Sequence, residues 1–476
     1  MGVGVEAEHL NESRLGRVLD QLYEYGVSLL FLKIACEMVK CCGIKVSNAH
    51  IDGTSLSVHG KYLSSEEVEE SCAEEIVLLE ESEPVAININ HGYSRDHRSD
   101  LKQFTLSLLT TGEEGIPLFM QVGDGNELDQ NAFPKMIREF QSQWLGEQPE
   151  VYVMDAAFYT EKNLNQCSES INWISRVPLT IKAAQELTKL LLPEQFSKSD
   201  LYEKYSFCAV CSEYAVIKQR WIIVESEDRR DADLKSLSKR IEQSLTLKNK
   251  NLKSLRNKEF ACETDALIAA KDFEKTLNYH LLAELTILAK PHYQRRGKPK
   301  LGDEVSYYTY HIQANLGENE IVIKTHRNQA GRFILATNLL DEKLWANETV
   351  LQEYKEQQTT ERGFRFIKDP LFFASRVFLK NTKRIMALAM IMTLALMVYS
   401  LGQLQLRQSL KLTDSHLPDQ KGKPTAQPTL RWILQCFQSV HLVFIDGIKS
   451  SIQLTDRQKL ILQFLGASCH QYYFLS

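Results

Sequence analysis

The sequence lacks the features that mark secreted proteins and strongly basic nucleic-acid-binding proteins. Residues 1–25 are polar and acidic, whereas a secretory signal begins basic and continues apolar. The formal net charge of the 476 residues is −5, so attraction to a polyanion requires locally concentrated positive charge. Hydrophobic residues make up 43% and charged residues 25% of the chain, which is typical of a soluble protein with two or three domains.

The ten cysteines form neither a disulfide framework nor a zinc-finger pattern. Cys208 and Cys211 make one CxxC pair, and no second pair of cysteines or histidines follows at short spacing. A structural zinc ion normally needs four such ligands. We therefore expect reduced, mostly buried thiols, as in a cytosolic protein.

Long apolar runs are also scarce, and one segment, 385–401, resembles a membrane span. It reads IMALAMIMTLALMVYSL, which is near the lower length limit for crossing a bilayer. The polar residues after it continue the helical period. We favour a buried core helix and no membrane partner; a membrane anchor is the alternative, which sedimentation with membranes would test.

The first 180 residues alternate helical and strand patterns. Apolar residues recur at intervals of three and four between 10 and 42, which predicts helices, and from Ala49 the period changes to two. The elements expected next are a strand containing Asp52, a hairpin (104–111 and 116–123), a helix (129–140), a strand (151–158), a helix (161–166) and a strand (173–177). This order opens a ribonuclease-H-like fold, an α/β architecture in which helices flank a mixed sheet.

The middle of the chain, from about 180 to 331, breaks this rhythm. Strands are predicted at 214–224, 305–313 and 320–325, around a long polar helix. Ten basic residues lie between 229 and 258, and a short basic loop follows at 295–300. The helix is either a solvated face or a phosphate-binding surface. The basic residues we select as DNA-contacting candidates are Lys239, Arg240, Lys248, Lys250 and Lys253.

The strand pattern resumes at 331–338, and helices are predicted at 349–365 and 385–401. A polar, proline-containing linker lies at 418–428, and further amphipathic pieces follow it. The expected domains are a remnant of an N-terminal helical domain (1–47), the first part of the α/β core (48–180), a β-rich insertion domain (181–330), the second part of the core (331–412) and a C-terminal helical segment (413–476).

Three acids occupy meaningful places in this arrangement. Asp52 lies within a strand, Asp155 ends a buried strand and Glu361 lies on a late helix. A buried acid is costly unless it is paired or binds a metal. Two strand acids that converge with a helical glutamate would form an oxygen-rich site suited to Mg²⁺.

The segment around Glu361 reads YKEQQTTERGFRFIKDP. It resembles the Tyr-x2-Arg-x3-Glu-x6-Lys signature of the insertion-sequence-four superfamily of bacterial DDE transposases. Tyr354, Glu361 and Lys368 are in register, and Gln357 stands where the signature has arginine. Four other segments are similar to one branch of the superfamily, in the same order: HIDGTSLSVHGKY, HGYSRDHRSDLKQF, GDGNELD and VYVMDAAFYT.

The resemblance implies that Asp52, Asp155 and Glu361 form the catalytic, metal-binding triad, with Mg²⁺ as cofactor and Mn²⁺ as a substitute. It also implies that Tyr354 and Lys368 contact the DNA backbone. Gln357 could donate a hydrogen bond to phosphate, and Arg362 or Arg365 could supply the missing charge.

Three further features are interpreted through the resemblance. The gap of 206 positions from the second acid to the third (361 − 155) fits relatives with an inserted domain, in which a tryptophan stacks on a flipped base. Trp221 would be that residue, but a packed core tryptophan is the interpretation we favour. In the loop 91–100, we expect Arg95 and Arg98 to face DNA or brace the site. Metal binding through His91 and His97 is less suitable because Mg²⁺ prefers oxygen.

The function implied is that of a cut-and-paste DNA transposase. Its partners would be double-stranded DNA, as transposon inverted repeats and target DNA, and a second copy in a homodimer; some relatives form a hairpin intermediate. We expect it in the cytoplasm, at the nucleoid. The motif beginning at Ala7 normally lies well inside a helical domain, so a shortened N-terminus with poor end specificity is expected. The alternatives are a decayed DNA-binding remnant and a ribonuclease-H-like nuclease.

Overall fold

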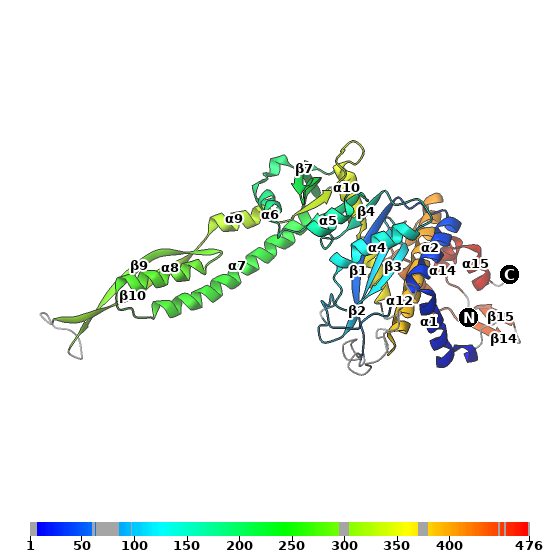
Figure 1. The fold of residues 1–476 in the computed structure, drawn as a ribbon, viewed down its shortest axis with the longest axis horizontal. Coiled ribbons are helices and arrows are strands. Elements are labelled where there is room, and N and C mark those ends of the chain that lie inside the picture. Colours follow the sequence, from blue (N-terminus) through cyan, green and yellow to red (C-terminus); the bar gives the residue numbers. More distant parts are fainter. Residues whose placement is uncertain are drawn as a thin grey trace, which may run out of the picture. The chain divides into compact units, whose positions relative to one another are not determined.

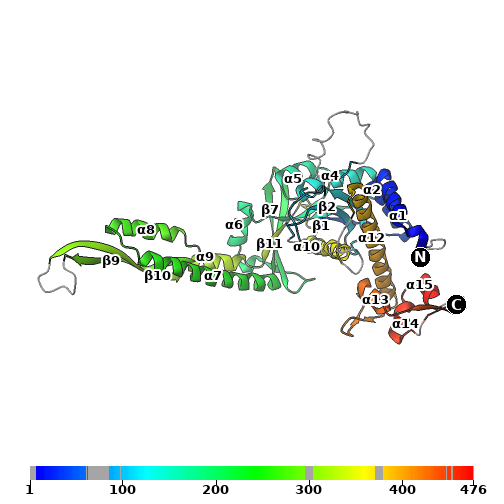
Figure 2. The same ribbon diagram turned by 90° about the horizontal axis from the view of Figure 1, so that it is seen from below.

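The computed structural model describes residues 7–59, 62, 85–96, 98–294, 304–369, 379–445, 448–451 and 454–474. The basic loop 295–300, the acidic stretch 64–83 and His97 lie outside the described residues. The chain divides into two compact units (Figures 1 and 2). Unit 1 comprises Met1–Arg176, Glu213–Gln219 and Thr337–Ser476, and unit 2 comprises Val177–Ser212 and Arg220–Ala336.

Unit 1 is built on a mixed sheet. Strands β1 (Asn48–Ser57), β2 (Gln103–Thr111), β3 (Pro117–Gly123), β4 (Val151–Met154) and β5 (Trp173–Val177) lie in the order β3-β2-β1-β4-β5. The pairs β1–β2 and β2–β3 are antiparallel, whereas β1–β4 and β4–β5 are parallel. The predicted hairpin is present as β2 and β3. The fold is therefore mixed α/β.

Helices cover this sheet on both faces. Eight consecutive residues of β1 are buried, although successive side chains point to opposite faces, so neither face is open to water. Helix α4 (Asp129–Gln143) contacts β1, β2 and β3, while α11 (Gln358–Ile367) contacts β1. Helices α2 (Val27–Cys42) and α12 (Thr382–Leu412) both contact β3.

The remaining helices of unit 1 are η1 (Ala7–Leu10), α1 (Glu12–Tyr25), α5 (Glu161–Cys167), α10 (Asn347–Glu356), α13 (Leu430–Phe437), α14 (Asp456–Gln463) and α15 (Ala467–Phe474). Two small hairpins complete the unit: β12 (Leu417–Pro418) with β13 (Pro424–Thr425), and β14 (Leu442–Ile445) with β15 (Ile448–Ser451).

The apolar segment 385–401 lies within the first two thirds of α12. By length and composition α12 could cross a membrane, but 56% of its most apolar stretch is buried within the protein. It packs against α1, α2 and β3, and Arg384 at its start forms an ion pair with Asp20 of α1, at 2.8 Å. This packing fits the core helix that the pattern favoured.

Unit 2 contains strands β6 (Ser197–Lys198), β7 (Tyr205–Tyr214), β8 (Ile217–Ser226) and β11 (Arg332–Thr337), and a long antiparallel pair, β9 (His280–Tyr293) and β10 (Val305–Glu318). Its helices are α6 (Lys182–Leu190), η2 (Pro193–Gln195), α7 (Glu227–Arg256), α8 (Glu263–Lys275) and α9 (Glu320–Gln329). Helix α8 contacts β9 and β10, and Phe260, Ala266 and Ile312 belong to the cluster buried between them. Most of the segment 181–330, the predicted insertion, falls in unit 2, whereas Glu213–Gln219 belongs to unit 1. Unit 2 contains helices as well as strands, and its charged segment 227–256 forms a 30-residue helix.

Two predicted elements differ from those observed. Residues 320–325 form the start of helix α9 instead of a strand, because the Asn319 side chain caps its first turn by accepting from the Val322 N–H, at 3.3 Å. The single helix predicted at 349–365 is divided at Gln357, whose N–H donates to the carbonyl of Tyr354. Trp221 lies on β8 and is 2% exposed, which fits a core tryptophan.

Candidate active site

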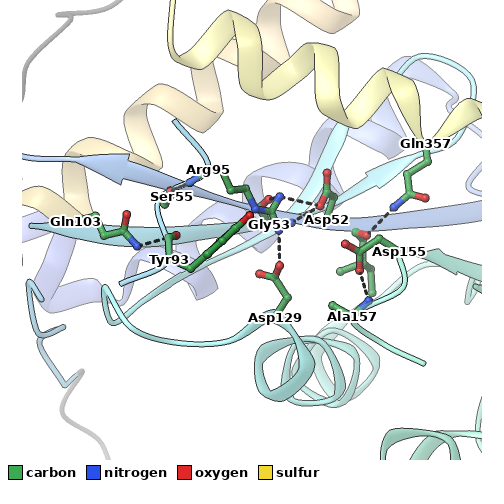
Figure 3. A network of polar contacts seen from close by, with 11 residues as sticks. Asp52, Gly53, Ser55, Tyr93, Arg95, Gln103, Asp129, Asp155, Ala157 and Gln357 are labelled. Carbon is green, nitrogen blue, oxygen red and sulfur yellow. Dashed lines mark hydrogen bonds and ion pairs between the residues drawn. The ribbon is translucent and has the colours of Figure 1, made fainter. Parts of the chain in front are cut away.

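Asp52 and Asp155 come from neighbouring positions on two parallel strands. The last residue pair of β1 and β4 is Ile51 with Met154; Asp52 is the next residue of β1, and Asp155 directly follows the end of β4. Adjacent strands lie about 4.8 Å apart, so the two carboxyl groups share one region of the sheet (Figure 3). The Ala157 N–H donates to Oδ1 of Asp155, at 2.9 Å, which fixes that side chain at the end of β4.

Both aspartates are poorly solvated. Asp52 is 7% exposed, and its pKa is raised to about 7 in total: burial is the main cause, the charge of Arg95 opposes it, and the charge of Asp155 contributes to the rise. Burial also raises the pKa of Asp155, and the charge of Asp129 adds to that rise. A cation placed between these carboxyl groups would therefore be attracted strongly.

Arg95 is the counterion of this cluster. Its Nη1 lies 3.3 Å from Oδ1 of Asp52 and also donates to the Gly53 carbonyl, while its Nη2 forms an ion pair with Asp129. Figure 3 shows the guanidinium between the two carboxylates. The Arg95 N–H donates to Oγ of Ser55, at 3.3 Å. Of the two roles predicted for the loop 91–100, this geometry fits site bracing for Arg95.

Two other residues of the loop 91–100, Asp96 and Arg98, also form ion pairs. Arg98 is paired with Asp100 at 2.8 Å, and its side chain is 49% exposed. Lys368, which follows α11, forms an ion pair with Asp96 at 2.7 Å. Lys368 is thus held by an acid in the structure rather than presented as a free cation.

Tyr354 and Glu361 lie on consecutive helices, α10 and α11. Burial raises the pKa of Tyr354, Arg176 is hydrogen-bonded to its phenol, and the charges of Asp155 and Glu361 both act on it. Tyr354 is therefore near both a strand acid and the helical acid. The Glu361 side chain is 55% exposed, and its Oε2 lies 3.9 Å from Nη2 of Arg365.

Gln357 is placed differently from the prediction. It is 7% exposed, and its amide donates to the Ile51 carbonyl at 3.5 Å, so it lacks the exposure that a phosphate contact needs. The break between α10 and α11 turns this side chain toward β1. Arg362 and Arg365 are both exposed and line a cavity of about 340 Å³ beside Phe366 and Tyr399.

The three predicted ligands are not drawn together into a closed site. Among the described residues, one group of three side chains brings its ligand atoms within 4.8 Å of one another, and that group is His50, Glu353 and Glu356. Asp52 and Asp155 supply carboxylate oxygens, which suit Mg²⁺. Glu361 is connected to Asp155 by Tyr354, because the charges of both acids act on the phenol of that residue.

The basic candidates of α7 lie in unit 2. Lys239, Arg240, Lys250 and Lys253 are exposed, and Lys248 donates to Oγ1 of Thr276 at 3.1 Å. Helix α7 has two buried residues, Leu237 and Leu252, so most of its surface faces solvent.

Sequence reasoning missed Asp129 and Arg176. Asp129 is the first residue of α4, at the end of the GDGNELD segment, and Arg176 lies on β5, next to β4. A signal existed for Asp129, because that segment was among the family-like ones. Neither residue could be linked to Asp52 or Tyr354 without the fold, since these contacts join distant parts of the chain.

Comparison with known proteins identifies two matching family models. The model described as the Transposase DDE domain matches residues 49–398, and a domain of unknown function, DUF4277, matches residues 1–36. No protein of curated function matches the chain.

Two solved structures are similar at low identity. One is the piggyBac transposase synaptic complex with hairpin DNA, at 10% identity and a TM-score of 0.33, with 74% of this chain and 46% of that chain covered. The other is the Mos1 transposase paired-end complex with the left transposon end, at 13% identity and a TM-score of 0.16, with 36% and 45% covered. The chain spans less than half the length of each. Because the Transposase DDE domain covers well over half of the present chain, including both strand aspartates and Glu361, the chain belongs to this family of DDE transposases.

Proposed function

We propose that this chain cuts DNA at transposon ends and joins those ends to target DNA by a cut-and-paste route. The proposal further holds that the core is ribonuclease-H-like and that the signature is that of the insertion-sequence-four superfamily. The observation that carries it is the placement of Asp52 on β1 beside Asp155 at the end of β4, both poorly solvated. Paired, desolvated carboxylates are typical of sites that hold divalent cations.

The proposed ligands are Asp52, Asp155 and Glu361, with Mg²⁺ as cofactor and Mn²⁺ as a substitute. Bound Mg²⁺ would lower the pKa of a water and stabilise the leaving 3′ oxygen of a phosphodiester. Glu361 lies on α11, directly after α10, and its charge and that of Asp155 both act on Tyr354 of α10. Arg95 would hold Asp52 in place and offset part of the acidic charge.

The proposed partner is double-stranded DNA, bound by a homodimer at the nucleoid in the cytoplasm. The two similar solved structures are transposases in complex with hairpin DNA and with a transposon end, and the present chain carries a Transposase DDE domain. On this chain, Tyr354, Arg362 and Arg365 lie beside Glu361 on α10 and α11, and the basic residues of α7 provide phosphate-binding charge.

The test is a cleavage and strand-transfer assay on transposon-end DNA with Asp52→Asn, Asp155→Asn and Glu361→Gln. Each should lower the cleavage rate at least about 1,000-fold, because a metal ligand contributes several kcal/mol to the transition state. Asp100→Asn is the matched control, since Asp100 is exposed and paired with Arg98 outside the cluster. Ca²⁺ should support DNA binding without cleavage.

Near-normal cleavage by any of the three variants would remove that residue from the triad. Nicks without joined products would favour a ribonuclease-H-like nuclease. End binding without cleavage by the wild-type chain in Mg²⁺ and Mn²⁺ would favour a decayed DNA-binding remnant.

A further inference from the structure

A second cluster of metal-ligand side chains lies on the same strand as Asp52. His50 of β1 is fully buried, and neither of its ring nitrogens has a hydrogen-bond partner among the described residues. Its Nε2 lies 3.8 Å from Oε2 of Glu353, which is also without a hydrogen-bond partner there. One ligand atom from each of His50, Glu353 and Glu356 lies within 4.8 Å of the other two. A buried imidazole without a partner costs folding free energy unless something else occupies its nitrogens.

The backbone leaves a space between these atoms. A methyl group added to Gly112 would lie 2.9 Å from Oε2 of Glu356 and 3.2 Å from Nε2 of His50. Both ligand atoms therefore face the bare Cα of Gly112. Thr359 fixes this turn, since its Oγ1 donates to the Gly112 carbonyl at 2.9 Å. Any side chain at 112 would fill the space that an ion would occupy.

The cluster also has an access route. Glu353, Glu356 and Gly112 line a cavity of about 520 Å³ in unit 1, which has room for water molecules as additional ligands. Glu113 and Glu114 line the same cavity, so its walls attract cations. The pKa of Glu356 is raised to about 7, mainly by burial and next by the charge of Glu353. A bound cation would relieve both causes.

We propose that His50, Glu353 and Glu356 bind a divalent transition-metal ion of the Zn²⁺ class, at a site separate from the Asp52–Asp155 acids. One imidazole and two carboxylates suit Zn²⁺ better than Mg²⁺, because Mg²⁺ prefers oxygen ligands alone. The ion would join β1, which carries Asp52, to α10, which carries Tyr354 and leads into α11. Its role is structural, since it fixes the helix beside the strand of the catalytic acids.

The experiment measures Zn²⁺ binding to the full chain, after chelator treatment, by competition with a chromophoric chelator and by Co²⁺ absorption spectra. The variants are Glu356→Gln, His50→Gln and Gly112→Ala, with Glu113→Gln as the control from the same cavity. The background variant Asp52→Asn, Asp155→Asn removes the other acids. We expect one tight Zn²⁺ per chain in the wild type, the background and the control, and a loss of affinity beyond the roughly 10–100-fold typical of outer-sphere changes in the three variants.

Gly112→Ala keeps the measurement interpretable if His50→Gln fails to fold. It alters no ligand, and the atom it meets is the movable end of Glu356. Equal Zn²⁺ affinity in the wild type and in folded Glu356→Gln and Gly112→Ala would overturn the site. So would loss of all tight binding in the Asp52→Asn, Asp155→Asn background, because the only tight site would then be that of the strand aspartates. Neither outcome depends on transposase activity.

Discussion

Two groups of acids meet at strand β1, and their charges are balanced in different ways. Asp52, with Asp155 and Asp129 nearby, is contacted by the Arg95 guanidinium. Two residues earlier on the strand, His50 faces Glu353 and Glu356. Lys45 lines the adjoining cavity, but among the described residues no arginine or lysine forms an ion pair with the second group.

The presence of an arginine in the first group and its absence from the second represent two ways of stabilising buried carboxylates. A guanidinium lowers the cost permanently, but it also competes with a metal for the same oxygens. Without such a counterion, the cost of burying a carboxylate can be offset by an exchangeable cation. A reactive site benefits from an arginine that orients one ligand, whereas a structural metal site benefits from having none.

The largest expected effect comes from removing the permanent counterion. Arg95→Ala should lower the free energy of unfolding by about 2–3 kcal/mol in the absence of metal, because Asp52 and Asp129 would face each other unpaired. The value is below that for a fully buried pair, since the Arg95 side chain is 33% exposed. Denaturant unfolding of the chelator-treated chain measures it.

Arg98→Ala is the control for this prediction. Arg98 lies in the same loop but is paired with the exposed Asp100, so its loss should change stability by less than about 1 kcal/mol. Equal destabilisation by the two variants would show that the loop, and not the bridge to Asp52, is what Arg95 supports.

Neutralising an acid of the second group should stabilise the metal-free chain, whereas removing Arg95 from the first group should destabilise it. The pKa of Glu356 is raised from 4.5 to about 7, so the folded state holds a proton that the unfolded state releases between those pH values. Stability of the metal-free chain should therefore fall as pH rises from about 4.5 to 7. Glu356→Gln removes this cost and should stabilise the metal-free chain at pH 8 by about 1–2 kcal/mol, after a discount for partial exposure.

Unfolding curves at pH 5 and pH 8, recorded with chelator present, test this prediction. The stabilisation should be largely absent at pH 5, where Glu356 is protonated in the folded wild type. A variant that is less stable than the wild type at both pH values would mean that Glu356 is already compensated within the protein. Saturating Zn²⁺ should reverse the order at pH 8, since only the wild type keeps all three ligands.

The features of the two acid groups that depend on local sequence pattern could be predicted from the sequence. Asp52 within a strand and Asp155 at the end of another follow from period-two alternation and a short apolar run. The partners that decide the charge balance are not local. Arg95 lies in a loop, and Glu353 and Glu356 lie on a helix some 300 residues after His50. Their meeting with β1 depends on strand order and helix packing, which periodicity does not encode.

Local sequence pattern also gave the wrong type or length of element where a helix cap or a break in a helix determines the structure. The β-branched run Ile321–Val322–Ile323 favours a strand, yet capping by Asn319 starts α9 there. The division at Gln357 has no proline or glycine to signal it. Its consequence is functional, since it buries the side chain that was expected to contact phosphate.

The smallest effect on stability, but a clear one on binding, is expected for the five candidate cations of α7, most of which are exposed. Neutralising Lys239, Arg240, Lys248, Lys250 and Lys253 together should change stability little, because surface charges away from packed features contribute within about ±0.5 kcal/mol each. If these residues bind phosphate, the slope of log K against log salt should become shallower by about 0.9 for each phosphate that the variant no longer neutralises.

The control is Glu242→Gln on the same helix, which removes an acid and should strengthen DNA binding instead. Binding of end DNA between about 50 and 200 mM salt decides the matter. An unchanged slope in the five-fold variant would make α7 a solvated face, and the DNA-binding charge would then have to lie elsewhere on the chain.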